Sequence, residues 1–476
     1  MKRIILFILL LVTAVSLSAH PWKPGHYVII DTDGGIDDIR AISLLLSSPD
    51  VRVLAITISP GALSTGLAYL KVKSLLNSYY HNGFPVGINR ISDFKSPGFP
   101  VALNSVWGPE ENIDEKAAPD SKSVISSVLA AEKTKISFIC LGGMSTAAQA
   151  INEIPAFSNQ IKEIIWSSVT PGDKKSFNYT IDKKASQDVT DGSIPVKMIN
   201  GMNDALFFDE QTIKSISSIQ NVYAAKISDF FKNEKSANHK YSSAANDELA
   251  VIWLHKPEFF LSEAANNVTG YSLSNTDLAR ESFLKIMAGE YIAKNQVIKE
   301  LPSNPSFYFT DIEPSVSEII KRHGTEEWTS GVIANELHRH LGVFAIIGVK
   351  MGIRAREYFA TGVDEFMVTS NAGSVPPLSC MNDGIQVSTG ATAGHGLLTV
   401  NNVPPASPSA VFTYMNRKIK ITLIPELTEK ISSELKEINF IHGLDSDIYW
   451  ELVRKNSIKY WRDLDRHEIF IIEEIK

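Results

Sequence analysis

An apolar run that leads straight into a group of carboxylates is the feature that most constrains this chain. Residues 28–30 are typical of a buried strand, and four aspartates follow within eight residues, around two glycines: Asp31, Asp33, Asp37 and Asp38. Apolar residues then recur at helical spacing over 36–47. The pattern predicts a strand, a tight turn and a helix. The carboxylates should gather beyond the carboxyl end of the strand, where open α/β sheets form their sites.

The four carboxylates predict a bound cation. Close negative charges repel one another, and oxygen ligands suit Ca²⁺ or Mg²⁺ rather than Zn²⁺. The structural alternative is an acidic turn whose aspartates cap the helix. One N-cap explains one aspartate but not four that follow an apolar strand, so the cation is favoured.

The rest of the chain predicts two domains. Strands at 51–58, 84–88, 136–141, 161–167 and 194–199 alternate with helices at 67–80, 121–132 and 146–154. This order predicts an α/β domain with a mostly parallel sheet covered on both faces, and 91–120 forms a long loop, a candidate lid. Three prolines in 302–314 mark a boundary between domains at 26–310 and 316–476. The second should be a smaller α+β domain, with helices at 316–322, 328–336 and 343–359, a hairpin over 411–424 and closing helices.

The N-terminus reads as a signal peptide over residues 1–19. Two basic residues precede an apolar stretch at 4–15, and small residues surround a cleavage point near Ala19. The expected product is exported, periplasmic and free of the membrane after cleavage; a retained anchor is the alternative. The two cysteines, Cys140 and Cys380, provide no disulfide framework. A net charge of -7 gives no sign of nucleic-acid binding.

Residues 31–38 resemble the metal motif of the inosine–uridine-preferring nucleoside hydrolases. Their first half also resembles the haloacid-dehalogenase phosphotransferases, in which Asp31 would be the nucleophile. Three more segments, at 141–146, 176–185 and 246–259, match the nucleoside hydrolases in the correct order. The haloacid-dehalogenase reading predicts neither of the last two. The resemblance covers about 26–310.

This resemblance implies a site and a reaction. Ca²⁺ would be held by two aspartates of the first motif, one backbone carbonyl and a later aspartate: Asp33, Asp38, Leu141 and Asp247. Asp33 would also act as general base on the water that the metal activates. Substrate contacts would come from Asp37, Asn178 and Asn246. The implied activity is hydrolysis of the N-glycosidic bond of a small ribonucleoside-like substrate, and a homo-oligomer is one state that the family allows.

The chain departs from the family where the substrate binds. Asn246 stands where the family has a histidine that protonates the leaving base. Ser176 stands where the family has a glutamate that binds the 5′ end of the ribose. Ala62 replaces a family asparagine. These departures predict an altered substrate pocket, with leaving-group help from elsewhere or a leaving group that needs none. The alternative is an exported protein that binds Ca²⁺ or a ligand without hydrolysis.

Two stretches of the second domain resemble the formylmethanofuran dehydrogenase E-subunit family over about 325–440. One is the His-Arg-His run at 338–340, and the other is 379–396. If the two histidines stand at a helix start, His338, His340 and Cys380 form a set suited to Zn²⁺ or another transition metal; His395 is a candidate fourth ligand. The alternative is that Cys380 is a buried thiol at a helix start and that the two histidines cap or pack without binding a metal.

Overall fold

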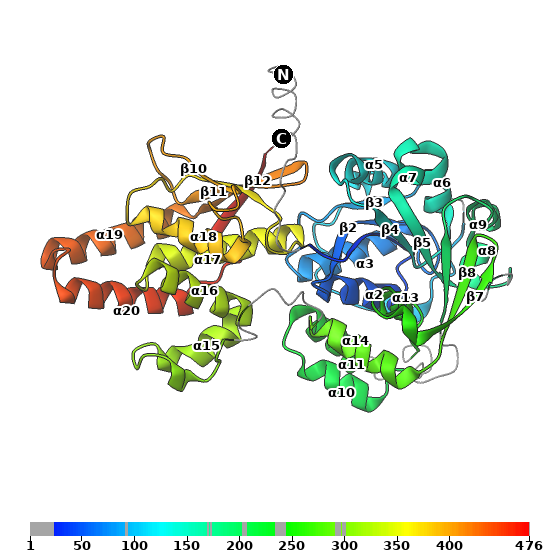
Figure 1. Ribbon diagram of the computed structural model, residues 1–476, viewed down its shortest axis with the longest axis horizontal. Coiled ribbons are helices and arrows are strands. Elements are labelled where there is room, and N and C mark those ends of the chain that lie inside the picture. The colour runs from blue at the N-terminus through cyan, green and yellow to red at the C-terminus, as the bar shows by residue number, and fades with distance from the viewer. Residues whose placement is uncertain are drawn as a thin grey trace, which may run out of the picture.

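The computed structural model describes residues 23–90, 94–168, 171, 174–201, 207–233, 244–290, 297 and 301–475. Within these ranges the chain forms two bodies that lie side by side, each built on its own sheet (Figure 1). The predicted signal peptide at 1–19 lies outside the described residues. Over the described part of the chain, no helix has both the length and the apolar character needed to cross a membrane.

The first domain is built on an eight-stranded sheet. Its order is β3-β2-β1-β4-β5-β6-β8-β7, with parallel pairing throughout except for the antiparallel edge pair β7 and β8. The strands span His26–Thr32 (β1), Val51–Ile58 (β2), Val86–Ile88 (β3), Ile136–Cys140 (β4), Ile161–Ser168 (β5), Val196–Asn200 (β6), Phe260–Ala265 (β7) and Val268–Leu273 (β8).

Helices cover both faces of this sheet. Successive side chains of a strand point to opposite faces, and the apolar ones form a cluster with helices on each face. Val28 and Ile30 of β1 pack into one apolar cluster, and Tyr27 and Ile29 pack into the other. The first cluster includes residues of α2 (Ile36–Ser47), α3 (Thr65–Ser78), α10 (Glu210–Ser218), α11 (Val222–Asn233), α13 (Glu248–His255) and α14 (Thr276–Met287). The second includes residues of α5 (Ser121–Ala131), α6 (Ser145–Glu153), α7 (Pro155–Gln160) and α9 (Lys183–Thr190). Two short helices, α4 (Pro100–Asn104) and α8 (Phe177–Ile181), lie in connecting segments.

The topology fixes where a site forms. β1 lies between β2 and β4. On one side of β1 the sheet continues through β2 and β3, and on the other side it continues through β4, β5 and β6. The chain order therefore reverses at the carboxyl end of β1. Ligands of open α/β sheets bind at such a switch point, and Asp33, Asp37 and Asp38 lie there.

The second domain combines six helices with a five-stranded sheet. The helices are α15 (Glu313–His323), α16 (Thr325–His338), α17 (Val343–Phe359), α18 (Met381–Thr389), α19 (Pro425–His442) and α20 (Asp447–Asp463). The sheet order is β10-β9-β11-β12-β13, with strands Met367–Ser370 (β9), Leu398–Val400 (β10), Ser409–Tyr414 (β11), Arg417–Leu423 (β12) and Phe470–Ile475 (β13). Helix α17 approaches α18 closely at Gly348, where a Cβ would lie 2.1 Å from the Met381 carbonyl oxygen.

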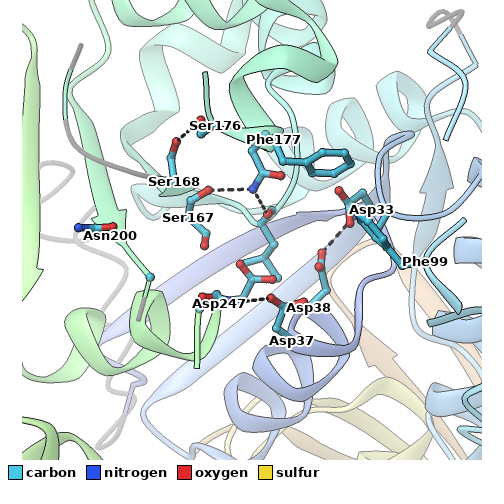
Figure 2. Close-up of a pocket in the computed structure, with 15 residues that line it drawn as sticks. Asp33, Asp37, Asp38, Phe99, Ser167, Ser168, Ser176, Phe177, Asn200 and Asp247 are labelled. Atoms are coloured by element: carbon cyan, nitrogen blue, oxygen red, sulfur yellow. Dashed lines mark hydrogen bonds between the residues drawn. The ribbon is translucent and has the colours of Figure 1, made fainter. Parts of the chain in front are cut away.

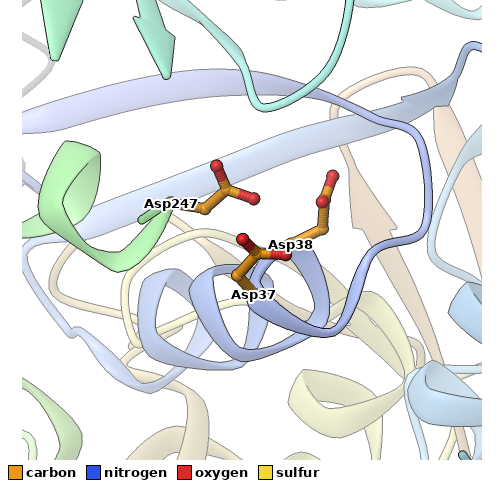
Figure 3. A group of neighbouring side chains, drawn as sticks. All are labelled: Asp37, Asp38 and Asp247. Atoms are coloured by element: carbon orange, nitrogen blue, oxygen red, sulfur yellow. The ribbon is translucent and has the colours of Figure 1, made fainter. Parts of the chain in front are cut away.

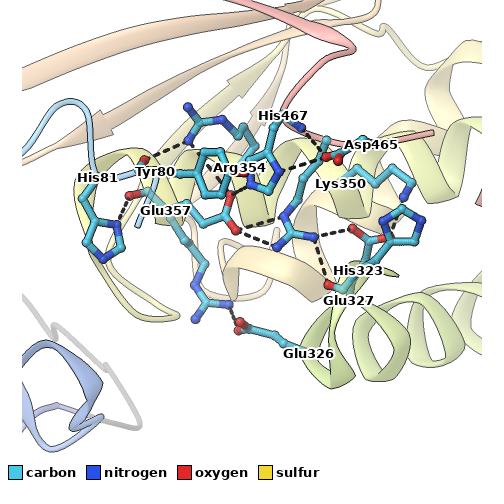
Figure 4. Close-up of polar contacts among 12 residues, drawn as sticks. Tyr80, His81, His323, Glu326, Glu327, Lys350, Arg354, Glu357, Asp465 and His467 are labelled. Atoms are coloured by element: carbon cyan, nitrogen blue, oxygen red, sulfur yellow. Dashed lines mark hydrogen bonds and ion pairs between the residues drawn. The ribbon is translucent and has the colours of Figure 1, made fainter. Parts of the chain in front are cut away.

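A polar network joins the two domains, and Figure 4 shows its central part. From the second domain, Arg354 donates to the Tyr80 carbonyl at 3.1 Å, and the His467 ring stacks on the Tyr80 ring with centroids 3.5 Å apart. His81 makes a 2.6 Å hydrogen bond with the Glu357 carbonyl. Removing one partner of a partly buried hydrogen bond costs free energy, so these contacts hold the segment after α3 against the second domain.

Most predicted elements are found where the pattern put them. The segments 36–47, 51–58 and 343–359 have the predicted bounds. Two expectations are wrong. His338 is the last residue of α16 and His340 follows it, so the pair stands at a helix end and not at a helix start. The chain also closes on β13, which pairs with β12, and not on a helix.

Candidate active site

The switch point holds a pocket of about 230 Å³ that gathers most of the predicted residues (Figure 2). Asp33 follows β1, and Asp37 and Asp38 lie in the first turn of α2. Leu141 follows β4, and Asp247 precedes α13. All of the predicted Ca²⁺ and substrate residues line this pocket: Asp33, Asp37, Asp38, Leu141, Asn178, Asn246 and Asp247.

Three of the carboxylates face one another at the pocket floor. Asp37, Asp38 and Asp247 each offer an oxygen within 4.8 Å of the others (Figure 3). Asp38 is fixed by Thr32, whose hydroxyl donates to it at 2.6 Å, and by the Asp33 backbone N–H at 3.1 Å. Three oxygens held this close match the ligands that a hard cation prefers.

Asp33 lines the same pocket but lies outside this closest group of three. Its carboxylate accepts from the Gly35 backbone N–H at 3.3 Å and lies against Gly61 and Gly142. A Cβ at Gly61 would stand 2.0 Å from Asp33 Oδ2. A glycine is therefore required at position 61 for Asp33 to adopt this position.

Burial and mutual repulsion disfavour the charged forms of these groups. Burial and the Asp37 charge raise the pKa of Asp38 to about 6. Burial, followed by the neighbouring carboxylates, raises the pKa of Asp33 and of Asp247 well above the usual range. A bound cation would offset this repulsion and stabilise the ionised carboxylates.

The Leu141 carbonyl is supported by Asn178. The Asn178 side-chain amide donates to the Leu141 carbonyl at 2.7 Å and to the Ser167 carbonyl at 2.9 Å. One amide thus ties together the ends of β4 and β5. Because a carbonyl oxygen has two lone pairs, Leu141 keeps one for a further partner.

Asn246 and its neighbours connect α13 with α2. The Asn246 amide donates to Asp37 Oδ2 at 2.9 Å. Behind it, Arg40 and Glu248 form a fully buried ion pair with Nε and Oε1 2.5 Å apart. Glu248 also accepts from the Asn246 backbone N–H at 3.2 Å. The pair therefore links the two segments that carry Asp38 and Asp247.

The expectation that Asp31 gathers with the other three aspartates is wrong, because Asp31 lies in the core and does not line the pocket. It is fully buried, and its two oxygens accept from the hydroxyls of Thr57 at 2.6 Å and Ser59 at 2.8 Å. Burial raises the pKa of Asp31 to about 7. A carboxylate held in this way binds β1 to β2 and does not face a substrate.

Several lining residues were not predicted from the sequence as site residues. Ser167, Ser168, Asn200 and Gly201 lie at the carboxyl ends of β5 and β6, where the rule for open sheets locates ligands. That signal was available in the sequence. Phe99 and Phe177 come from connecting segments that carry no comparable signal.

In the second domain, the predicted metal residues line one cavity of about 750 Å³: His338, His340 and Cys380. His338 Nδ1 lies 2.7 Å from Asp383, and the His338 and His340 ring centroids are 4.2 Å apart. Among the described residues, the donor atoms of His338, His340 and Cys380 do not all lie within 4.8 Å of one another. His395 does not line this cavity; its Nδ1 lies 3.2 Å from the Gly390 carbonyl oxygen.

Comparison with known proteins shows the family to which this chain belongs. The model of the inosine-uridine preferring nucleoside hydrolases matches residues 28–310. The chain therefore belongs to this family. A second model, FmdE, Molybdenum formylmethanofuran dehydrogenase operon, matches residues 337–439, so the two-domain resemblance inferred from the sequence is confirmed.

Among curated proteins, the chain is similar to the pyrimidine-specific ribonucleoside hydrolases RihA. It is 24% identical over 254 residues to that of Escherichia coli strain SMS-3-5, with 49% of this chain and 80% of the relative covered. It is 25% identical over 253 residues to that of Citrobacter koseri, with the same coverage.

Solved structures give more distant matches. A purine-preferring ribonucleoside hydrolase from Gardnerella vaginalis matches with a TM-score of 0.45 and 17% identity, over 55% of this chain and 98% of that one. A plant nucleoside hydrolase, the PpNRh1 enzyme, matches with a TM-score of 0.46 and 15% identity, over 56% and 99%.

Proposed function

We propose that this protein hydrolyses the N-glycosidic bond of a ribonucleoside-like substrate and that it requires Ca²⁺. The observation that carries the proposal is the carboxylate floor of the pocket, where side chains of α2 and of the segment before α13 converge at the switch point of the sheet. The ligands would be Asp33, Asp38, Asp247 and the Leu141 carbonyl. No histidine or cysteine is among the described lining residues, which favours Ca²⁺ over Zn²⁺.

The bound ion would polarise a water and the two ribose hydroxyls. Asp33 takes the proton of the attacking water, because its carboxylate lies in the pocket beside the floor. Asp37 accepts from a sugar hydroxyl, and Asn246 holds Asp37 in place through their 2.9 Å hydrogen bond. Asn178 acts by fixing the Leu141 carbonyl. These contacts accelerate hydrolysis to the extent that they strengthen as positive charge develops on the sugar.

The test is release of reducing sugar from a panel of nucleosides and other N-ribosides. Asp38→Asn and Asp247→Asn should each abolish release. Asp188→Asn is the matched control, because Asp188 lies on α9, pairs with the exposed Lys184 and does not line the pocket. Equal activity of all three variants would contradict the proposed site.

The alternatives make different predictions. A phosphohydrolase would need Asp31 as nucleophile, but Asp31 is held in the core by Thr57 and Ser59, so we expect no phosphate release. A protein that only binds Ca²⁺ or a ligand would gain thermal stability with Ca²⁺ and release no sugar from any member of the panel.

For the second domain we propose a transition-metal site formed by His338, His340 and Cys380, with Zn²⁺ one candidate. Asp383 supports this, because a carboxylate on His338 Nδ1 leaves Nε2 to coordinate a metal. The three donors would move together on binding. Metal analysis of the purified protein tests the site: bound metal should be lost in His338→Ala and kept in His395→Ala.

We also propose that the protein is exported, on the strength of residues 1–19. N-terminal sequencing of the protein from cell fractions tests this. Cleavage near Ala19 with recovery outside the cytoplasm is expected, and an intact N-terminus in the cytoplasm would contradict it.

A further inference from the structure

Four carboxylates and no basic side chain line the described part of the first domain's pocket. Asp33, Asp37, Asp38 and Asp247 all line it. Among the lining residues that the structure describes, there is no Lys, Arg or His to balance them. One divalent cation balances two of the four carboxylate charges, so the pocket keeps a net negative charge when more than two of them are ionised. Such a pocket attracts a cationic substrate more strongly than a neutral nucleoside.

Apart from its aspartates, the side chains that line the described part of the pocket are poor donors of a proton to a leaving group. A neutral nucleobase leaves readily only if a nitrogen atom is protonated, and a positioned general acid contributes about 10²–10⁴-fold to such a step. Asn246 lines the pocket, but an amide does not release a proton at neutral pH. Its amide already donates to Asp37. Apart from the four aspartates, which are assigned to the metal, the water and the sugar, the other polar side chains of the described lining are serines and asparagines, which do not act as acids.

Two aromatic rings stand at the same pocket. Phe99 and Phe177 both line it, and their ring centroids are 5.4 Å apart (Figure 2). They remain open to a ligand, since Phe99 is 45% and Phe177 38% exposed. A flat heteroaromatic ring can stack on such faces, and a positive charge on that ring adds a cation–π attraction.

These three observations point to one substrate class. We propose that the preferred substrate is a cationic N-riboside, in which the sugar is bonded to the quaternary nitrogen of a pyridinium-type ring. This inference rests on the proposed N-ribosyl hydrolysis. The water oxygen bonds to C1′ of the sugar as the C1′–N bond breaks. The electron pair of that bond returns to the ring nitrogen, which becomes neutral without a proton. One proton passes from the water through Asp33 to solvent.

The test compares kcat/KM of the full chain, with Ca²⁺ present, for the riboside of 3-carbamoylpyridinium, inosine and uridine. The cationic riboside should be favoured by about 100-fold or more, the lower bound of what a missing acid costs the neutral substrates. Across pyridinium ribosides, the rate should fall steeply as the leaving pyridine becomes more basic. Inosine or uridine cleaved as fast as the cation would overturn this inference and leave the proposed function intact. No sugar from any substrate would overturn the proposed function itself.

The aromatic pair has its own test. Phe99→Leu and Phe177→Leu keep an apolar side chain and remove the ring. Each should weaken binding of the cation 1-methyl-3-carbamoylpyridinium, measured as a competitive inhibitor, by about two- to fivefold. Binding of neutral benzamide should change less. Phe440→Leu, which alters an exposed ring on α19, is the matched control and should change neither. Equal losses for the charged and neutral inhibitors would contradict a cation-specific role.

Discussion

Replacing Arg40 with methionine should destabilise the first domain and loosen its metal site together. Arg40 and Glu248 are both 0% exposed at the side chain, and Nε and Oε1 are 2.5 Å apart. Arg40 also donates to the Ala244 carbonyl at 2.9 Å, and its guanidinium carbon lies 4.5 Å from the Phe208 ring centroid. Methionine fills a similar volume but offers no charge and no donor. Arg40→Met therefore leaves Glu248 buried without its cation.

The size of the effect follows from the burial. Removing one partner of a buried ion pair costs about 3–5 kcal/mol, whereas replacing both with apolar residues is often neutral. We therefore expect Arg40→Met to lose about 3–5 kcal/mol of unfolding free energy, and Arg40→Met combined with Glu248→Leu to recover most of it. Because Arg40 and Glu248 adjoin the segments of Asp38 and Asp247, the single variant should also bind Ca²⁺ about 10–100-fold more weakly.

The assay is urea unfolding of the four proteins of this double-mutant cycle. Hydrogen exchange of residues 36–47 reports the first domain separately, since the second domain has its own apolar core. Calorimetry with Ca²⁺ gives the affinities. A loss below about 1 kcal/mol in Arg40→Met, or no recovery in the double variant, would refute the argument that the pair is coupled.

Three further predictions concern the metal, the domain contact and the second core. Ca²⁺ at 100 times its dissociation constant should stabilise the protein by about 2.7 kcal/mol, and Asp247→Asn should remove that gain; a gain unchanged in the variant would locate the ion elsewhere. Burial lowers the pKa of His81 from 6.5 to about 4, so the unfolded state takes up the proton first. The contribution of neutral His81 to the unfolding free energy is present above pH 6.5 and is lost as the pH falls through 4. Unfolding curves across this range should show that the parent protein loses up to about 3 kcal/mol more unfolding free energy than His81→Gln. Equal losses in the two proteins would contradict this. Gly348→Ala should cost about 1–3 kcal/mol, because its Cβ would meet the Met381 carbonyl, while the open Gly394→Ala should melt like the parent.

The parts predicted well from the sequence are those in which local pattern and tertiary packing agree. Residues 36–47 bury the apolar stripe that their spacing indicates. β2 is buried along its whole length, as a strand covered on both faces should be. The carboxylates that follow β1 lie at the carboxyl edge of the sheet, because the direction of the parallel strands determines this position.

Other features had no local signal. Asn246 contacts Asp37 from 209 residues away, and only the family resemblance connected the two segments. Helix α16 ends at His338, and the residue that follows it, Arg339, has a φ of 68°. Glycine or asparagine is the usual residue at such a position, so the helix end before His340 could not be predicted from the sequence. Phe99 and Phe177 line the pocket because two connecting segments meet, and their own sequences do not specify this contact.

The most direct test of the account is a Ca²⁺ titration of sugar release by chelator-treated protein, carried out beside calorimetric binding of Ca²⁺. We predict no release without Ca²⁺ and a half-maximal rate at the measured dissociation constant. Full release in the presence of chelator, or saturated binding with no release from any riboside, would contradict the claim that the carboxylates of α2 and Asp247 form a catalytic metal site.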